Sequence, residues 1–454
     1  MDLNKIYNGN CLEVLKDFPD NFFDGCVTDP PYGISFMNKH WDYQIPSVDI
    51  WKEILRVLKP GGYVLCACGT RTQHRMAVNI EDAGFEIRDV ITWHYGSGFP
   101  KSHDISKAID KQAGAERTVI DTKETKSGGM ANVNKTNKEQ GFRPNNYNEH
   151  GNIFEITEPA TDAAKEWDGW GTALKPATEF WTMARKPLSE STVAENVLKY
   201  GTGGININGS RISLNGEKPP TGSAKRVYKA NDYTEEKIYG DNKETSSLGR
   251  FPANVIFDEF TGQILDEQTP NLQKSKGGYV RKNGEQQFLG QMGNGITDEP
   301  NGIIDEGGAS RFFYCAKASN AERNKGLNGF EAKERDDRGN NQATRVCIDC
   351  GLTDNGINDH SGCSGEYDYK KCSPIKNTHP TIKPVYLMRY LVKLIIPKNG
   401  IVVDPFIGSG TTGIAAKMEM INYVGIELQP EYCKIAEARI KAWNPDAYKP
   451  QTLF

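Results

Sequence analysis

Two short proline-containing segments, one near each end of the chain, constrain the fold more than any other feature. Asp29–Tyr32 (DPPY) follows the apolar run Gly25–Thr28, and Asp404–Thr412 (DPFIGSGTT) follows Ile401–Val403. Each apolar run is typical of a buried strand. In an open α/β sheet, ligands bind beyond the carboxyl ends of the strands, so we expect both segments to face one crevice.

The regions around these two segments alternate between helix and strand patterns. Apolar residues at helical spacing predict a helix from Ser47 to Leu58, which Lys59–Gly62 should end. Strands are then expected at Tyr63–Cys68 and from Phe85 to Trp93, and the alternation returns after residue 379. Strands interleaved with helices predict an α/β fold of Rossmann-like type with a mainly parallel sheet.

Composition divides the 454-residue chain into core segments and polar insertions. The expected core segments are 1–100 (first half of the core), 175–200 (a strand at Phe180–Arg185 and a helix), 309–330 (a strand at Arg311–Ala316) and 379–454 (second half). The expected insertions are 101–174, the Gly-, Asn- and Lys-rich region 201–308, and the cysteine-rich region 331–378.

Charge and hydropathy limit the partners of the chain. The net charge of −4 gives no global positive field, although local basic patches can still bind nucleic acid. No apolar run approaches the roughly 20 residues that span a bilayer, and the N-terminus lacks the apolar stretch of a signal peptide. We therefore expect a cytoplasmic protein with no membrane partner.

The glycine-rich segment Gly408–Gly413 is suited to a nucleoside cofactor. Its glycines allow a sharp turn and a close approach of ligand to backbone, and the amides that open a helix near Thr411 favour an anion. Glu427 ends the next predicted strand, where a carboxylate can accept hydrogen bonds from both ribose hydroxyls. The chain ends too soon afterwards for a second mononucleotide-binding half, which favours S-adenosylmethionine over a dinucleotide. A tight turn without a ligand is the alternative.

Lys383 precedes an apolar helix that is expected at Val385–Ile395. Two interpretations of this lysine stay open. It binds a carboxylate of the cofactor, or it is a solvated lysine at the start of a helix.

The DPPY segment carries the groups needed to activate an exocyclic amine of adenine or cytosine. Such an amine is a weak nucleophile because its lone pair is delocalised into the ring. The Asp29 carboxylate and the Pro30 carbonyl can accept both amine hydrogens, and Pro30 and Pro31 fix the backbone that points this carbonyl. Stacking of the base on Tyr32 would contribute about 1–3 kcal/mol. The structural alternative is a rigid turn with a packed tyrosine.

Together, the DPPY segment, the DPFIGSGTT segment and the run His379–Pro384 resemble the amino-group DNA methyltransferases. The DPPY segment comes first, as in the circularly permuted beta class, and further stretches resemble phage or mobile-element adenine methylases. The resemblance implies a methyltransferase core that uses S-adenosylmethionine to methylate adenine N6 in a flipped-out DNA base. Cytosine-N4 methylation and a non-catalytic DNA-binding scaffold with this fold are the alternatives.

The resemblance also implies roles for single residues and for one region. The implied catalytic group is Asp29, Pro30, Pro31 and Tyr32. The implied cofactor-binding residues are Asn10, Asp29, Lys383, Asp404, Phe406, Gly408, Ser409, Gly410, Thr411, Thr412 and Glu427. The family often has an acid where this chain has Asn10. By the same analogy, region 201–308 recognises the target sequence.

Four cysteines in region 331–378 form a candidate structural zinc site. Cys347 and Cys350 have the spacing of a zinc knuckle, whereas Cys363 and Cys372 lie farther apart than is usual. A histidine, His360 or His379, is an alternative ligand. The sequence leaves open a restriction endonuclease partner and the choice between a monomer and a homodimer.

Overall fold

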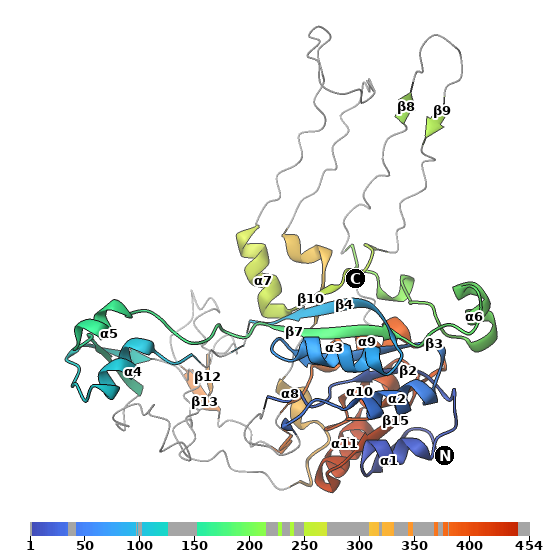
Figure 1. Ribbon diagram of the computed structural model, residues 1–454, viewed down its shortest axis with the longest axis horizontal. Coiled ribbons are helices and arrows are strands. Elements are labelled where there is room, and N and C mark those ends of the chain that lie inside the picture. Colours follow the sequence, from blue (N-terminus) through green and yellow to red (C-terminus); the bar gives the residue numbers. More distant parts are fainter. Residues whose placement is uncertain are drawn as a thin grey trace. The chain divides into compact units, whose positions relative to one another are not determined.

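The structure is a computed structural model that describes residues 2–34, 42–96, 98, 102–125, 152–214, 226–228, 237–239, 249–269, 308–316, 320–330, 344–347, 367–370, 376–379 and 381–443. The chain forms two compact units (Figure 1). The first comprises Met1–Ser97, Ala177–Gly326 and His379–Phe454, and the second comprises Gly98–Pro176 and Leu327–Thr378. The second unit consists of segments close to the expected insertions 101–174 and 331–378.

The first unit is built on a nine-stranded sheet with the order β1-β15-β14-β2-β3-β7-β4-β10-β11. Its strands are β1 (Lys5–Asn8), β2 (Phe23–Thr28), β3 (Leu58–Gly69), β4 (Glu86–His94), β7 (Thr178–Arg185), β10 (Val255–Asp258), β11 (Tyr314–Ala316), β14 (Ile401–Asp404) and β15 (Asn422–Glu427). In this sheet β7 runs antiparallel to both neighbours, β3 and β4, and the remaining pairings are parallel. The prediction of an α/β fold with a mainly parallel sheet is confirmed.

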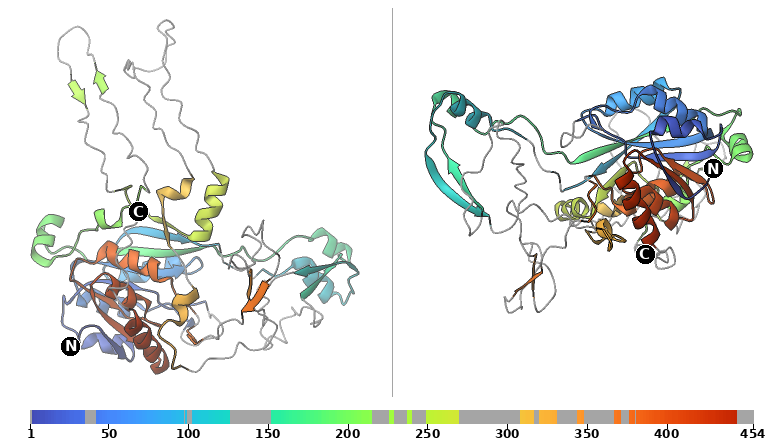
Figure 2. Two further views of the ribbon diagram at one scale, coloured as in Figure 1. Left: turned by 180° about the vertical axis from the view of Figure 1, so that it is seen from behind. Right: turned by 90° about the horizontal axis from the view of Figure 1, so that it is seen from below.

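Helices cover both faces of this sheet. Those of the first unit are α1 (Cys11–Lys16), α2 (Val48–Val57), α3 (Gln73–Asp82), α6 (Val193–Tyr200), α7 (Glu259–Gln268), α8 (Asn320–Asn324), α9 (Val385–Ile395), α10 (Thr411–Met418) and α11 (Pro430–Ala442). The right panel of Figure 2 shows the blue helices of the N-terminal part and the red helices of the C-terminal part on opposite sides of the sheet.

Side chains of the strands alternate between two apolar cores, one on each face of the sheet. Along β3, Val64 and Cys66 belong to the core that contains the apolar residues of α1, α2 and α3. Leu65 and Ala67 belong to the other core, which contains the apolar residues of α9, α10 and α11. This burial on both faces explains why the core strands read as continuous apolar runs.

Two expected strands differ from the structure in their bounds. Strand β3 begins at Leu58, directly after α2, because Gly61 and Gly62 pair with Lys186 through backbone hydrogen bonds of 3.1 and 2.9 Å. The apolar run that begins at Arg311 is a strand only from Tyr314, since its partner β10 is short and pairs only with Tyr314–Ala316. The preceding residues form a 3-10 helix, Ala309–Phe312.

The described residues of the second unit form two antiparallel strand pairs and two helices. Strand β5 (Val119–Thr125) pairs with β6 (Asn152–Thr157), and β12 (Thr344–Cys347) pairs with β13 (Tyr367–Lys370). The helices are α4 (Ile105–Gln112) and α5 (Asp162–Glu166).

Two short strands of the first unit, β8 (Arg226–Tyr228) and β9 (Lys237–Tyr239), pair with each other outside the nine-stranded sheet. A further 3-10 helix covers Asn208–Ser210. Within the described ranges, none of the helices combines the length and apolar character needed to cross a bilayer.

Candidate active site

The centre of the sheet brings the two sequence motifs together. Strands β2 and β14 are parallel neighbours, with Val402 opposite Gly25 and Val403 opposite Cys26. Thr28, the last residue of β2, donates a hydrogen bond from Oγ1 to Asp404 Oδ1 at 2.6 Å. The DPPY and DPFIGSGTT segments therefore leave adjacent strands at the same edge of the sheet, as the sequence predicted.

Asp404 is a buried connection between these two segments. Besides Thr28, it accepts hydrogen bonds from Thr412 Oγ1 at 2.5 Å and from the Phe406 amide at 3.0 Å. Burial raises the pKa of the Asp404 carboxyl to about 6, although these hydrogen bonds act in the opposite direction. The bonds are all to protein groups, so Asp404 holds the end of β2 and the loop Pro405–Gly410 in one arrangement. The sequence predicts that this loop binds the cofactor, and it is called the cofactor loop below.

The glycines of the cofactor loop are required by the backbone itself. Gly408 and Gly410 have φ values of +53° and +84°, in the region that favours glycine. A Cβ atom on Gly410 would also lie 2.9 Å from the Cβ atom of Ala436 in α11. The tight turn and the packing against α11 are therefore sufficient to explain these glycines, whether or not a ligand approaches them.

Arg439 of α11 supports the cofactor loop from inside the protein, a role that the sequence did not predict. Its guanidinium is fully buried and donates hydrogen bonds to the Ser409 carbonyl at 2.5 Å and to Ser409 Oγ at 2.9 Å. A longer contact of 3.4 Å reaches Thr411 Oγ1. Desolvation lowers the pKa of Arg439 to about 10. The available signal was an arginine between Ala436 and Ile440 on the apolar face of the helix.

Glu427 and Asn10 lie at the same edge of the sheet as the cofactor loop. Glu427 ends β15 and accepts hydrogen bonds from the Gly408 amide at 3.0 Å and the Gln429 amide at 2.8 Å, and burial raises its pKa. Asn8 pairs with Glu427 in the sheet, which places the following Asn10 nearby. Asn10 caps α1 by accepting a hydrogen bond from the Leu12 amide, so it has a structural role as well.

His379 packs against the glycine turn as a neutral ring. Its Nδ1 atom is 2.7 Å from the Thr381 carbonyl oxygen, and its ring meets Tyr432 edge to face at 4.7 Å between centroids. A Cβ atom on Gly408 would lie 2.7 Å from His379 Nε2. Desolvation lowers the pKa of His379 to about 4, so the imidazole is uncharged at neutral pH.

The DPPY segment forms a cluster of charges with Lys383. The ammonium of Lys383 lies 2.8 Å from Asp29 Oδ2 and 3.2 Å from Tyr32 Oη, and Tyr32 Oη donates to Asp29 Oδ1 at 2.8 Å. Desolvation lowers the pKa of Lys383, but the nearby carboxylates outweigh it and raise the pKa above its usual value. The interpretation of Lys383 as a solvated lysine is wrong, because its side chain is only 9% exposed.

A third carboxylate, Glu179, completes this cluster and was missed by the sequence analysis. Glu179 Oε2 lies 3.2 Å from Lys383 Nζ and 3.3 Å from Tyr32 Oη. It is the second residue of β7, a strand that the sequence predicted only from Phe180. A single glutamate before an apolar run gave no signal of a role at the DPPY segment.

The backbone of Tyr32 is fixed by two further polar residues. Asp42 Oδ1 accepts hydrogen bonds from the amides of Tyr32 at 2.6 Å and Gly33 at 3.0 Å. Thr72 Oγ1 donates to the Tyr32 carbonyl at 2.7 Å. The half-buried ring lies against Gly69, whose added Cβ atom would be 3.2 Å from Tyr32 Cδ2. This ring is therefore held in one position beside Asp29.

The predicted zinc site falls largely outside the described residues. Cys350, Cys363 and Cys372 lie there, and only the backbone of Cys347 in β12 is described. In the part of the chain that the structure does describe, no three His, Cys, Asp or Glu side chains gather as metal ligands would. The zinc site stays a prediction.

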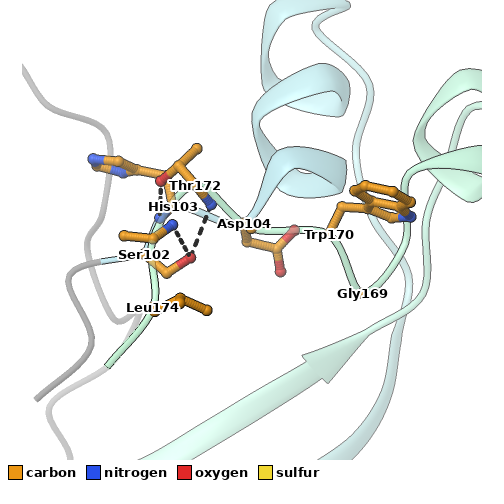
Figure 3. Close-up of a pocket in the computed structure, with 9 residues that line it drawn as sticks. Ser102, His103, Asp104, Gly169, Trp170, Thr172 and Leu174 are labelled. Carbon is orange, nitrogen blue, oxygen red and sulfur yellow. Dashed lines mark hydrogen bonds between the residues drawn. The ribbon is translucent and has the colours of Figure 1, made fainter. Parts of the chain in front are cut away.

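The second unit contains an open depression of about 710 Å³, which is lined by the segments Ser102–Asp104 and Gly169–Leu174 (Figure 3). Ser102 Oγ accepts hydrogen bonds from the amides of Thr172 at 3.0 Å and Ala173 at 3.3 Å, which ties the two walls together. The side chains of Trp170 and Leu174 are exposed there, at 59% and 93%. The depression contains none of the predicted catalytic or cofactor-binding residues.

Comparison with known proteins assigns the chain to a family. A family model described as DNA methylase matches residues 23–438, which is most of the chain. The chain belongs to this DNA methylase family. The match confirms the resemblance to DNA methyltransferases that the two motifs predicted.

Similar proteins match over shorter stretches. The type II methyltransferase M2.DpnII of Streptococcus pneumoniae is 40% identical over 75 residues, which cover 16% of this chain and 28% of that protein. The type II methyltransferase M.ScaI of Streptomyces caespitosus is 36% identical over 85 residues, or 19% of this chain and 26% of that protein. The matched stretch thus spans about a quarter of the length of each relative.

Two solved structures show a distant likeness. M1.HpyAVI in complex with SAM is 15% identical, with 96% of this chain and 98% of that chain covered and a TM-score of 0.34. The PvuII DNA methyltransferase, described as cytosine-N4-specific, is 13% identical, with 96% and 85% covered and a TM-score of 0.39.

Proposed function

We propose that this protein transfers a methyl group from S-adenosylmethionine to an exocyclic amine of a DNA base, and that the amine is N6 of adenine. The observation that carries this proposal is the junction of the two motif segments, which the hydrogen bond between Thr28 and Asp404 links at the ends of β2 and β14. Membership of the DNA methylase family supports it. Cytosine N4 is the alternative acceptor, since both amines need the same hydrogen-bond acceptors.

The residues of the cofactor loop and its neighbours fit S-adenosylmethionine. The buried carboxylate of Glu427 is suited to the ribose hydroxyls, and Asn10 lies at the same edge for the adenine ring. The positive φ values of Gly408 and Gly410 give the sharp turn expected beside the methionine part, and Phe406 comes just before this turn in the sequence. When bound, the cofactor supplies an electrophilic methyl group. Lys383 already has three acceptors for its three N–H donors, which favours a role at Asp29 rather than at the cofactor.

The DPPY residues act on the base. Asp29 and the Pro30 carbonyl accept the two amine hydrogens, and the fixed ring of Tyr32 stacks on the base. The ammonium of Lys383, 2.8 Å from Asp29 Oδ2, orients the carboxylate that accepts these hydrogen bonds. Extrusion of a base from duplex DNA costs a few kcal/mol, and stacking on Tyr32 offsets part of that cost.

The test is incubation with radiolabelled S-adenosylmethionine and mixed DNA, followed by digestion to nucleosides. We expect label in N6-methyladenine, no label with Asp29→Ala, and unchanged cofactor binding by that variant. Label in N4-methylcytosine would replace the adenine assignment. Absence of label from wild-type reactions would favour the DNA-binding scaffold, and competition with RNA and protein acceptors would reveal a different substrate.

Three further roles are proposed from the sequence patterns. Region 201–308 recognises the target sequence, and its β10 is also a strand of the central sheet. Cys347, Cys350, Cys363 and Cys372 bind a structural zinc ion. The enzyme acts on DNA in the cytoplasm of a bacterial or phage-infected cell, alone or beside a restriction endonuclease.

A further inference from the structure

Glu179 occupies a position that the architecture of the sheet determines. It is paired on both sides, opposite Gly69 of β3 and opposite Trp93 of β4. Because β7 runs antiparallel to these strands, its first residues lie at the edge where the parallel strands end. A residue of β7 therefore reaches the DPPY segment from a strand that has a neighbour on each side.

Neutralisation of Lys383 does not require Glu179. Asp29 alone, at 2.8 Å, would balance the charge of the ammonium. Glu179 adds a second carboxylate with only 17% of its side chain exposed, at a site where burial disfavours charge and raises its pKa. One ammonium between two carboxylates leaves the ionised cluster with a net negative charge. A purely structural ion pair needs only one carboxylate for the ammonium and would carry no net negative charge.

We propose that Glu179 is a positioning residue for methyl transfer, which shares Lys383 with Asp29 so that the lysine orients Asp29 without cancelling its negative charge. This inference rests on the proposed function. Lys383 has three N–H donors, and Asp29, Tyr32 and Glu179 accept them at 2.8 to 3.2 Å. Glu179 thereby fixes the direction of the lysine, and the lysine fixes the carboxylate that meets the amine.

The net negative charge of the Asp29–Lys383–Glu179 cluster lies near the amine nitrogen, where positive charge develops during the reaction. The amine nitrogen gains positive charge as its bond to the methyl carbon forms and the carbon–sulfur bond breaks, with the electron pair of that bond left on sulfur. One amine proton then passes to Asp29, to which it is hydrogen-bonded, and from there to water. A fixed negative charge near the nitrogen stabilises this transition state, whereas a neutral Asp29–Lys383 pair would stabilise it less.

The groups that face Glu179 are Asp29 and Tyr32 of the DPPY segment, Lys383, Cys68 of β3 and Tyr95 after β4. Burial raises the pKa of Glu179, so the wild-type rate should fall at acid pH as Glu179 takes up a proton and stops directing Lys383. Glu179→Gln removes this titration. The fall of the methyl-transfer rate at low pH, the acid limb of the pH–rate profile, should therefore move to lower pH. A merely structural role for Glu179 would lower the rate without moving that limb.

The experiment measures single-turnover methyl transfer to DNA from pH 5 to 9 with the full chain. Glu179→Gln should lower the plateau rate by about tenfold or more and move the acid limb to lower pH, with the cofactor Kd within about twofold of wild type. Glu179→Asp keeps the charge and should keep the limb. The matched control is Glu86→Gln, which removes the carboxylate that Arg185 contacts at the other end of β7.

A wild-type plateau for Glu179→Gln, or a lower plateau with an unmoved acid limb, would overturn the positioning role. Should Glu179→Gln fail to fold, Glu179→Asp decides, since a shifted limb in that variant contradicts the proposal. Failure of the proposed function is distinguishable, because wild-type protein would then transfer no label to DNA at any pH.

Discussion

Tyr32 combines an aromatic face for stacking with a hydroxyl that belongs to the charge cluster. Tyr32→Ala should weaken binding of a flipped base more than binding of the cofactor, because the stacking surface is lost. Tyr32→Phe keeps the face but loses the hydrogen bond to Asp29, which measures 2.8 Å. We expect near-normal base binding and a rate about tenfold lower, since a hydrogen bond to a charged group is worth about 1.5–3 kcal/mol. The fluorescence of DNA containing 2-aminopurine measures binding of the flipped base, and single-turnover transfer measures the rate. A fully active Phe variant would show that the hydroxyl has no part in the reaction.

For single residues, the sequence was informative where a chemically distinctive side chain directly follows or ends a predicted strand. The roles expected of Asp29, Tyr32 and Glu427 depend on residues directly after apolar runs, and the structure places them at one edge of the sheet. Glu179 and Arg439 escaped prediction for a physical reason. Each contacts a motif far away in the chain, and no local pattern marks a side chain whose partner is set by tertiary pairing.

Among the elements, the loop between β3 and α3 is the best candidate for contact with the DNA backbone. Thr72 of this loop holds Tyr32. Arg71 in the loop and Arg75 in the first turn of α3 are exposed, and neither forms an ion pair with any residue in the described ranges. The first turn of α3 contains no acid that would repel phosphate. Phosphates beside a flipped base are therefore expected to lie against these arginines.

Arg71→Ala and Arg75→Ala should each weaken DNA binding whatever the sequence, and should each reduce the slope of log K against log salt by about 0.9. Titration of DNA at several salt concentrations gives the slope. The control is Arg88→Ala, because Arg88 is also exposed but lies beside Glu86 at 3.8 Å. Equal slopes for the wild type and both variants would exclude phosphate contacts by the loop and the first turn of α3.

Element boundaries show where sequence patterns stop being sufficient. Helix α9 has the expected bounds, Val385–Ile395, because a long apolar face and a preceding proline define it locally. The antiparallel direction of β7 was not predicted. The direction of a strand depends on its neighbours, and an apolar run such as Phe180–Ala184 reads the same in both directions.

For the whole molecule, the order of strands explains how motifs from opposite ends of the chain form one site. The adjacent pair β2 and β14 joins an N-terminal strand to a C-terminal one, and Asp404 bonds Thr28 on one side and Thr412 on the other. Loss of this connection should therefore affect global folding as well as the cofactor loop.

The burial of Asp404 gives folding stability a specific pH dependence. Its pKa is about 6 in the folded state and near 4 in an unfolded chain. Between these values the folded state binds more protons at this group, so the contribution of Asp404 to stability is present below pH 4 and is lost as pH rises to 6. The loss is about 3 kcal/mol at most. Asp404→Asn removes this titration. We expect the difference in unfolding free energy between wild type and Asp404→Asn, measured with urea at pH 4, 5 and 6, to shift in favour of the variant as pH rises. A difference that is constant across this range would show that Asp404 titrates alike in both states and is not confined by the two loops.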